Sequence, residues 1–278
     1  MAVEMLSYIE RNSPIHRLTG VTKLLSFILW STAAMLTYDT RILFFLLMAS
    51  IAVFAVSKVK WREISFVLIF ILIFLLLNDV AIYLFSPQEG VKIYGTRHVL
   101  FNLPGDYDLT LEQLFYQLNI TIKYLTVIPA ALLFIVTTHP SEFASSLNRI
   151  GVSYRIAYSV ALALRYIPDI QRDYRNIALS QQARGIDLSR KEKLTKRIKN
   201  ALSIIIPLIF SSLDRIEVIS NAMELRGFGK KKERTWYSAR PFTKGDYIAL
   251  GLVTAFFILS LIITFHDGTR FYNPFLKP

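Results

Sequence analysis

Cysteine is absent from this chain of 278 residues. Disulfide frameworks, thiolate chemistry and cysteine-ligated metals are therefore excluded. Histidine is scarce, and the residues of this type are His16, His98, His139 and His266. They lack the spacing of metal ligands, and no catalytic constellation of side chains is recognisable. We therefore expect a protein that is not an enzyme and that holds no metal and no cofactor.

A complete phosphate-binding loop is also lacking. Residues 227–230 read Gly-Phe-Gly-Lys, like the end of a Walker loop. That loop requires a glycine where Glu224 stands and a serine or threonine where Lys231 stands. The chain therefore carries no recognisable nucleotide site of its own.

Acidic residues are fewer than basic ones, 20 Asp and Glu against 32 Lys and Arg, and the excess positive charge is concentrated. Residues 139–245 hold 20 Lys and Arg against 9 Asp and Glu, which gives +11 of the chain's net charge of +12. Such a segment beside apolar runs is typical of the cytoplasmic side of a membrane protein. A nucleic-acid binder is the least favoured class, because the basic charge adjoins predicted membrane spans.

Long apolar runs are abundant, and 53% of the residues are hydrophobic, which is typical of membrane proteins. Asp79 lies near the outer end of one of these runs, where its side chain either snorkels to the membrane interface or belongs to a buried site, and its position favours the first. The five runs predicted to span the membrane are 21–38, 42–56, 64–85, 119–138 and 247–265.

The order of the spans suggests an orientation and a division of the chain. Basic residues precede the first span, so we expect a multi-pass protein of the cell membrane with its N-terminus inside. Residues 1–138 form an N-terminal membrane region with four transmembrane helices. Residues 139–245 form a coupling region on the cytoplasmic side, and residues 246–278 contain the last span and a C-terminal tail.

Turn and capping signals predict the connections. Residues 86–108 are expected to form an outer loop, with a short hairpin around 91–103, and the sequence does not reveal its role. Thr110 and Gln113 fit a capping box at the start of the helix that continues into the fourth span. A short helix is predicted from Pro140 until Gly151 ends it.

Two long amphipathic helices are predicted over 152–182 and 194–225. Each has roughly 30 residues and a length of about 45 Å, well beyond the ~30 Å of a bilayer's hydrocarbon core. Pro168 and Pro207 lie within them and are expected to kink them. The predicted fold is an all-α membrane protein with about five transmembrane helices plus these long amphipathic coupling helices on the cytoplasmic side.

Both long helices run into a tripeptide that ends in Arg-Gly. These tripeptides are Ala183-Arg184-Gly185 and Leu225-Arg226-Gly227. One such end alone favours an ordinary cap, in which glycine is left-handed and arginine lies at the negative end of the helix dipole. Two similar ends, 42 positions apart in one basic region, instead favour docking, in which each guanidinium enters a groove on a partner and binds a carboxylate.

These motifs resemble those of a known family, the transmembrane T component (EcfT and CbiQ) of energy-coupling factor (ECF) transporters. The first tripeptide matches the family's Ala-Arg-Gly motif, whereas the second has Leu225 where alanine is usual. Thr19 and Gly20 stand where the family's N-terminal box has Asp-Pro. Further likeness lies in His139-Pro140-Ser141-Glu142-Phe143, in Leu164-Arg165-Tyr166-Ile167-Pro168, and in His16-Arg17-Leu18 followed by Lys23-Leu24-Leu25.

The resemblance implies a non-catalytic scaffold of an ATP-driven importer in a prokaryotic plasma membrane. Such importers take up vitamins or, in a related group, cobalt or nickel. The scaffold would link two cytoplasmic ABC-type ATPase subunits, docked at Arg184 and Arg226, to a membrane-embedded substrate-binding S component. The sequence reveals neither the substrate, nor whether the two ATPases are identical, nor whether the S component is shared.

Two other classes remain open. A stand-alone secondary transporter would normally show inverted repeats and ionisable residues at mid-membrane depth, and the sequence shows neither clearly. A membrane enzyme would need histidines and carboxylates that cluster, and those of this chain are dispersed along the sequence.

Overall fold

The computed structural model describes residues 8, 11–102, 107–186, 194–231, 234–266 and 269–275, without the side chains of 61–63. The chain divides into two compact units. The first unit comprises Met1–His139 and Arg240–Pro278, and the second unit comprises Pro140–Ala239. Each unit is described separately.

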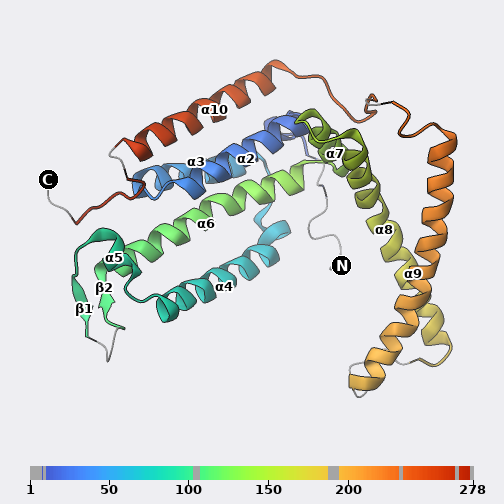
Figure 1. Cartoon of the computed structure of the whole chain (residues 1–278), viewed down its shortest axis with the longest axis horizontal. Coiled ribbons are helices and arrows are strands. Elements are labelled where there is room, and N and C mark those ends of the chain that lie inside the picture. The colour runs from blue at the N-terminus through green and yellow to red at the C-terminus, as the bar shows by residue number, and fades with distance from the viewer. Residues whose placement is uncertain are drawn as a thin grey trace. The chain divides into compact units, whose positions relative to one another are not determined.

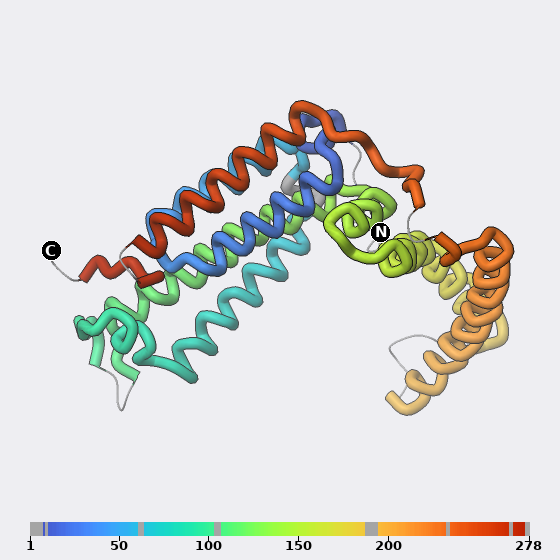
Figure 2. Tube along the Cα trace, turned by 45° about the horizontal axis from the view of Figure 1, so that its top comes forward, coloured from blue at the N-terminus to red at the C-terminus, as the bar shows by residue number. Residues whose placement is uncertain are grey.

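The first unit is a bundle of helices that run side by side (Figures 1 and 2). The only strands that the described residues form are two short antiparallel ones, paired through Val99 and Thr110. The elements of the unit are α1 (Pro14–Arg17), α2 (Gly20–Leu36), α3 (Thr40–Val56), α4 (Trp61–Phe85), α5 (Glu89–Tyr94), β1 (Val99–Phe101), β2 (Leu109–Thr110), α6 (Leu111–Thr137) and α10 (Lys244–Phe265).

Three of these helices are long and apolar enough to cross a membrane. They contain the segments Ile64–Phe85, Leu111–Thr137 and Lys244–Phe265. The other two predicted spans form the shorter apolar helices α2 and α3, each of 17 residues. The prediction of an all-α membrane protein is confirmed. The side of the membrane on which the N-terminus lies stays a prediction.

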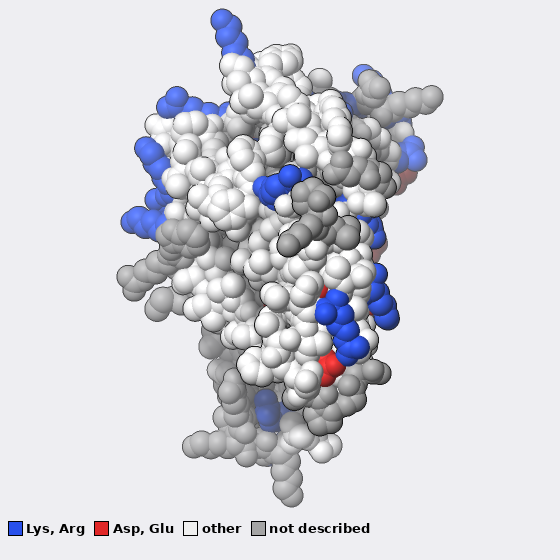
Figure 3. Space-filling model, turned by 90° about the vertical axis from the view of Figure 1, so that its left-hand side faces the viewer, with Lys and Arg blue, Asp and Glu red and all other residues white. Residues whose placement is uncertain are grey.

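Much of the bundle surface is apolar, as expected of helices that face lipid. In α4, only 6% of the apolar span is buried, and Phe66 and Phe70 are about two-thirds exposed (66% and 67%). The face of the molecule drawn in Figure 3 shows several separate Lys and Arg side chains and few Asp and Glu. An aqueous surface would rarely carry apolar patches this extensive.

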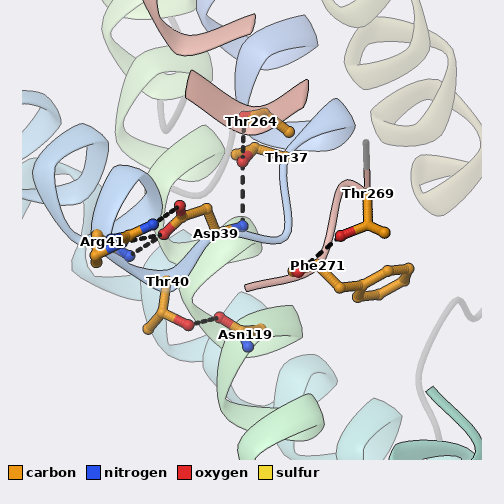
Figure 4. Close-up of polar contacts among 8 residues, drawn as sticks. All are labelled: Thr37, Asp39, Thr40, Arg41, Asn119, Thr264, Thr269 and Phe271. Carbon is orange, nitrogen blue, oxygen red and sulfur yellow. Dashed lines mark hydrogen bonds and ion pairs between the residues drawn. The ribbon is translucent and has the colours of Figure 1, made fainter. Parts of the chain in front are cut away.

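Helix α6 is central to the first unit and packs against α2, α3, α4 and α5. Its buried Asn119 accepts a hydrogen bond from Thr40 Oγ1 of α3 at 2.7 Å (Figure 4). The backbone carbonyl of Thr126 accepts one from Ser50 Oγ of α3 at 3.0 Å, and Ser50 in turn accepts one from Trp30 Nε1 of α2 at 2.8 Å. Such contacts fix the register between helices whose apolar surfaces alone would allow them to slide.

Asp79 of α4 points to α6, which agrees with the less favoured of its two interpretations, a buried site. Its Oδ2 accepts a hydrogen bond from Thr121 Oγ1 of α6 at 2.8 Å, and its backbone carbonyl accepts one from Gln117 Nε2 at 3.0 Å. Thr121 is the donor to the carboxylate, whose other oxygen, Oδ1, is buried without a hydrogen bond to any of the described residues. These two contacts join α4 to α6.

The predicted hairpin around 91–103 is wrong in its bounds. Helix α5 occupies the first part of that range, and a Cβ added to Gly90 would lie only 2.4 Å from the carbonyl oxygen of Glu112. Glycine therefore allows α5 to lie directly against α6. The strands form later, as β1 and β2. Residues 103–106, at the end of the predicted hairpin, lie outside the described residues.

The capping box predicted at Thr110 is half present. Thr110 Oγ1 accepts a hydrogen bond from the backbone N–H of Gln113 at 3.3 Å, as predicted. The Gln113 side chain, however, accepts a hydrogen bond from the Gly90 N–H at 2.8 Å and donates one to the Ser86 carbonyl at 3.1 Å. It therefore holds α5 in place instead of closing the box.

The start of α10 is joined to the start of α2 by one carboxylate. Asp246 is fully buried, and its Oδ2 accepts hydrogen bonds from the Thr243 N–H and Oγ1 in a capping box. Its Oδ1 accepts hydrogen bonds from the Thr19 N–H at 2.7 Å, from Thr19 Oγ1 at 3.0 Å and from Thr22 Oγ1 at 2.8 Å. Both oxygens are saturated, so this charge is stable although it is buried.

Replacing Asp246 with alanine should destabilise the first unit by about 3 kcal/mol or more, because it leaves several buried donors without an acceptor. The measurement is the thermal unfolding midpoint of the purified protein in detergent. Asp169→Ala is the matched control, since Asp169 forms an exposed pair with Arg172 and should contribute less than about 1 kcal/mol. Equal midpoints for the two variants would contradict this role of Asp246.

Candidate docking surface at the two Arg-Gly ends

The second unit consists of α7 (Pro140–Arg149), α8 (Tyr154–Ala183) and α9 (Leu194–Leu225). The short helix begins at Pro140 as predicted, and Gly151 follows it with a φ of 102°. The two long helices are present with nearly the predicted bounds, and each continues through its internal proline. Residues 187–193, in the predicted linker between them, lie outside the described residues.

Helices α8 and α9 pack antiparallel. Gln181 Nε2, near the end of α8, donates to the Ser203 carbonyl early in α9 at 3.3 Å. Further along, Arg215 Nη2 of α9 donates to Asp173 Oδ2 of α8 at 2.6 Å. The end of α9 therefore returns to the beginning of α8.

The two helices close the same way, with the same pair of backbone hydrogen bonds. At the end of α8, the Gly185 N–H donates to the Gln182 carbonyl at 2.9 Å, and the Ile186 N–H donates to the Gln181 carbonyl at 3.1 Å. At the end of α9, the corresponding bonds run from Gly227 to Glu224 (2.8 Å) and from Phe228 to Met223 (3.0 Å). Both ends are thus Schellman motifs.

Glycine makes this geometry possible. Gly185 and Gly227 have φ values of 83° and 68°, in the left-handed region that other residues enter only at a cost. The cap therefore uses backbone groups only. The side chain of the residue before each glycine is not needed for it.

Arg184 and Arg226 are the residues left available in this way. Both are exposed, and neither side chain makes a hydrogen bond or ion pair with any of the residues that the structure describes. Leu225 is 89% exposed beside Arg226, whereas the smaller Ala183 precedes Arg184. Each end therefore presents, beside an apolar side chain, a guanidinium that has no partner among the described residues.

The two ends lie far apart. The ring of Phe228, just after α9, is 4.8 Å from the ring of Tyr158 near the beginning of α8. Arg184 lies 26 residues further along α8, which corresponds to about 39 Å. The structure therefore does not bring the two arginines into one site but places them at opposite ends of the helix pair.

An aromatic cluster surrounds the second end. Phe228 and Trp236 both contact Tyr154 and Tyr158, with ring centroids between 4.8 and 6.2 Å apart. Burial in this cluster raises the pKa of Tyr154. The cluster therefore packs the loop that follows α9 against the beginning of α8.

Apolar side chains are also exposed along the middle of α9. Ile206, Ile209 and Phe210 are 49%, 51% and 63% exposed. A groove of about 360 Å³ between α8 and α9 is lined mainly by Leu162, Ala163, Ile170, Ile216, Ile219 and Met223. An apolar surface of this kind is typical of contact with another protein or with lipid.

Sequence reasoning misses Lys123, which lies within the candidate span α6. The signal was available, since a lone lysine in an apolar segment is unusual. Its Nζ donates to the Met35 carbonyl at the end of α2 at 3.0 Å and lies 3.0 Å from the centroid of the Tyr38 ring. Lys123 is therefore an ionisable residue among the spans, but its contacts serve helix packing. No group of three potential metal ligands occurs in the described part of the chain.

The two units together define a multi-pass helical membrane protein with two exposed cationic helix ends. Residues 11–237 match the family described as CbiQ, cobalt transport protein, and the chain belongs to this family. A relative from Leuconostoc gelidum subsp. gasicomitatum, named energy-coupling factor transporter transmembrane protein EcfT, is 27% identical over 269 residues, 92% of this chain and 95% of the relative.

A relative of the same name from Streptococcus equi subsp. equi is 28% identical over 254 residues, 88% of this chain and 91% of the relative. One from Staphylococcus aureus is 24% identical over 274 residues, 93% and 96% of the two chains. The predicted resemblance to an EcfT/CbiQ-like T component is confirmed.

Replacing Gly185 or Gly227 with alanine should loosen the corresponding helix end, because left-handed backbone costs alanine about 1 kcal/mol. Hydrogen exchange of residues 181–186 or 223–228 should accelerate several-fold, and asparagine at the same position should have a smaller effect. Gly251→Ala is the control, since Gly251 lies within α10 with open space around it. Unchanged exchange in both alanine variants would show that the caps do not depend on glycine.

Proposed function

We propose that this chain is the transmembrane scaffold and energy-coupling subunit of an ATP-driven ECF importer. Its relatives are named as transmembrane proteins of energy-coupling factor transporters, and its fold and motifs agree with that role. In this proposal the chain is not catalytic, and two cytoplasmic ABC-type ATPase subunits hydrolyse ATP. A membrane-embedded S component binds the substrate, a vitamin or another micronutrient.

The observation that carries the proposal is the pair of equally capped helix ends. Ala183, Arg184 and Gly185 form one docking end, and Leu225, Arg226 and Gly227 form the other. Each cap satisfies the helix carbonyls through the backbone, so the arginine side chain is left exposed and without a partner among the described residues. A purely structural cap arginine would instead be expected to bond the carbonyls of its own helix.

The separation of the ends supports two separate partners. One globular subunit could not easily enclose two tips about 39 Å apart along a stiff helix. A guanidinium can form two parallel hydrogen bonds with a carboxylate, which holds a helix end in a fixed orientation. Relative movement of two docked subunits would then be transmitted to α8 and α9.

The apolar side chains of α9 support a further contact. Residues such as Phe210 would lose exposed apolar area against lipid or against the S component. Residues 139–245 would thus act as the coupling region, with the partners bound at its ends and along its length. The basic charge of this region supports a position on the cytoplasmic side of the membrane.

Reversing either charge, by Arg184→Glu or Arg226→Glu, should reduce co-purification of the ATPase docked at that end at least tenfold, because two carboxylates would then face one another. The ATPase docked at the other end should be retained, and reversing both charges should remove both ATPases. The measurement is affinity purification of the tagged chain from native membranes in mild detergent, followed by mass spectrometry. Arg175→Glu, an exposed arginine within α8, is the matched control. Retention of the ATPases by a chain that carries both Arg184→Glu and Arg226→Glu would refute the docking role. A secondary transporter would then be tested by ion-driven uptake in liposomes.

The absence of cysteine allows a direct test of orientation. A single cysteine introduced by Gln182→Cys, near the end of α8, should react with a membrane-impermeant maleimide only after the cells are opened. Lys92→Cys in α5 should react in intact cells, since the Lys92 side chain is 73% exposed and lies in the loop predicted to be outside. The opposite labelling pattern would place residues 139–245 outside and exclude docking of cytoplasmic ATPases.

A further inference from the structure

The two Arg-Gly ends share a cap but differ in what supports it. At the first end, Gln181 Nε2 donates a hydrogen bond to the Ser203 carbonyl of α9 at 3.3 Å. At the second end, Arg234 Nη2 donates to the carbonyls of Arg226 at 3.0 Å and of Gly227 at 2.9 Å. The guanidinium of Arg234 therefore binds the backbone of the residue that is proposed to dock.

This contact is electrostatically favourable. The last carbonyls of a helix carry partial negative charge, and a cation that donates hydrogen bonds to them stabilises the helix end. A second guanidinium acts in the same loop, because Arg155 Nη2 of α8 donates to the Gly229 carbonyl at 3.2 Å. Two guanidinium groups thus donate hydrogen bonds to backbone carbonyls of residues 226–229.

The loop is also anchored to α7. Trp236, a member of the aromatic cluster, donates from Nε1 to Asn148 Oδ1 at 3.0 Å. Ser238 Oγ donates to the Ser141 carbonyl at 3.0 Å. The segment that follows α9 is therefore bound to α7 through Trp236 and Ser238, and to α8 through the aromatic cluster. Arg234 lies in the sequence between Arg226 and these contacts.

We propose that Arg234 is a positioning residue for Arg226, so that the second docking end is ordered before its partner arrives. Fixing a backbone in its bound geometry lowers the entropy that binding must remove, which strengthens binding without a new contact to the partner. Arg234 itself need not touch the ATPase. This inference rests on the proposed function, because it concerns how one of the two docking ends is prepared.

The test isolates the second end by working in an Arg184→Glu background, where retention of ATPases depends on Arg226. In that background Arg234→Gln should reduce retained ATPase about three- to tenfold, the size expected when one cation is lost from a helix end. Arg234→Lys, which keeps a cation within reach of the carbonyls, should restore at least half of the retention. Lys231→Gln is the matched control, since it removes the same charge from the same loop but no cap contact.

Two further measurements separate positioning from general stability and from the proposed function itself. In an Arg226→Glu background, Arg234→Gln should not reduce ATPase retention further. In the chain with Arg226 intact, Arg234→Gln should accelerate hydrogen exchange at residues 226–229 but not at residues 181–186. The inference about Arg234 would be overturned if Arg234→Gln reduced ATPase retention no more than Lys231→Gln does. It would also be overturned if Arg234→Gln had the same effect in the Arg226→Glu background. Neither result would affect the proposed function. Normal ATPase retention by Arg226→Glu would instead remove the proposed function on which it rests.

Discussion

A polar side chain buried in an apolar surrounding has no water to bind, so it must find its hydrogen-bond partners within the protein. The packing of the first unit depends on the partners that the polar side chains of α6 find on neighbouring helices. Asn119 binds Thr40 of α3, and Lys123 binds the last turn of α2. Ser50 of α3 reaches the backbone of α6 itself. Where lipid is as apolar as the helix surface, such bonds supply the specificity that the hydrophobic effect gives to soluble cores. α6 therefore determines where α2, α3 and α4 can lie.

Helix ends in the second unit also leave polar backbone groups without partners, and there the solution leaves two arginines exposed. The final carbonyls of α8 and α9 need donors, and left-handed glycines let backbone N–H groups provide them. Since the backbone completes each cap, Arg184 and Arg226 are released for contacts outside the chain. A single local requirement thus accounts for both the stability of the helix ends and their exposed charge.

Prediction from sequence succeeded where a local pattern determines the structure and failed where tertiary contacts compete with it. The apolar runs, Pro140, and the two Arg-Gly ends have strong local signals, and the helices begin and end close to the predicted positions. Asp79 and Gln113 were misjudged because their partners, Thr121 and Gly90, lie far away in the sequence. The support that Arg234 gives to Arg226 was hidden for another reason, since a basic run gives no sign of which of its residues binds a carbonyl.

The position of Lys123 has a consequence for biosynthesis. The span in α4 is almost continuously apolar until Asn78 and Asp79, near its C-terminal end, whereas α6 carries a lysine and an asparagine within its span. The Met35 carbonyl and Thr40, which receive these side chains, belong to helices that leave the ribosome earlier. The order of the chain thus supplies the polar partners before the helix that needs them is made, and a circular permutation that placed α6 first would remove that advantage.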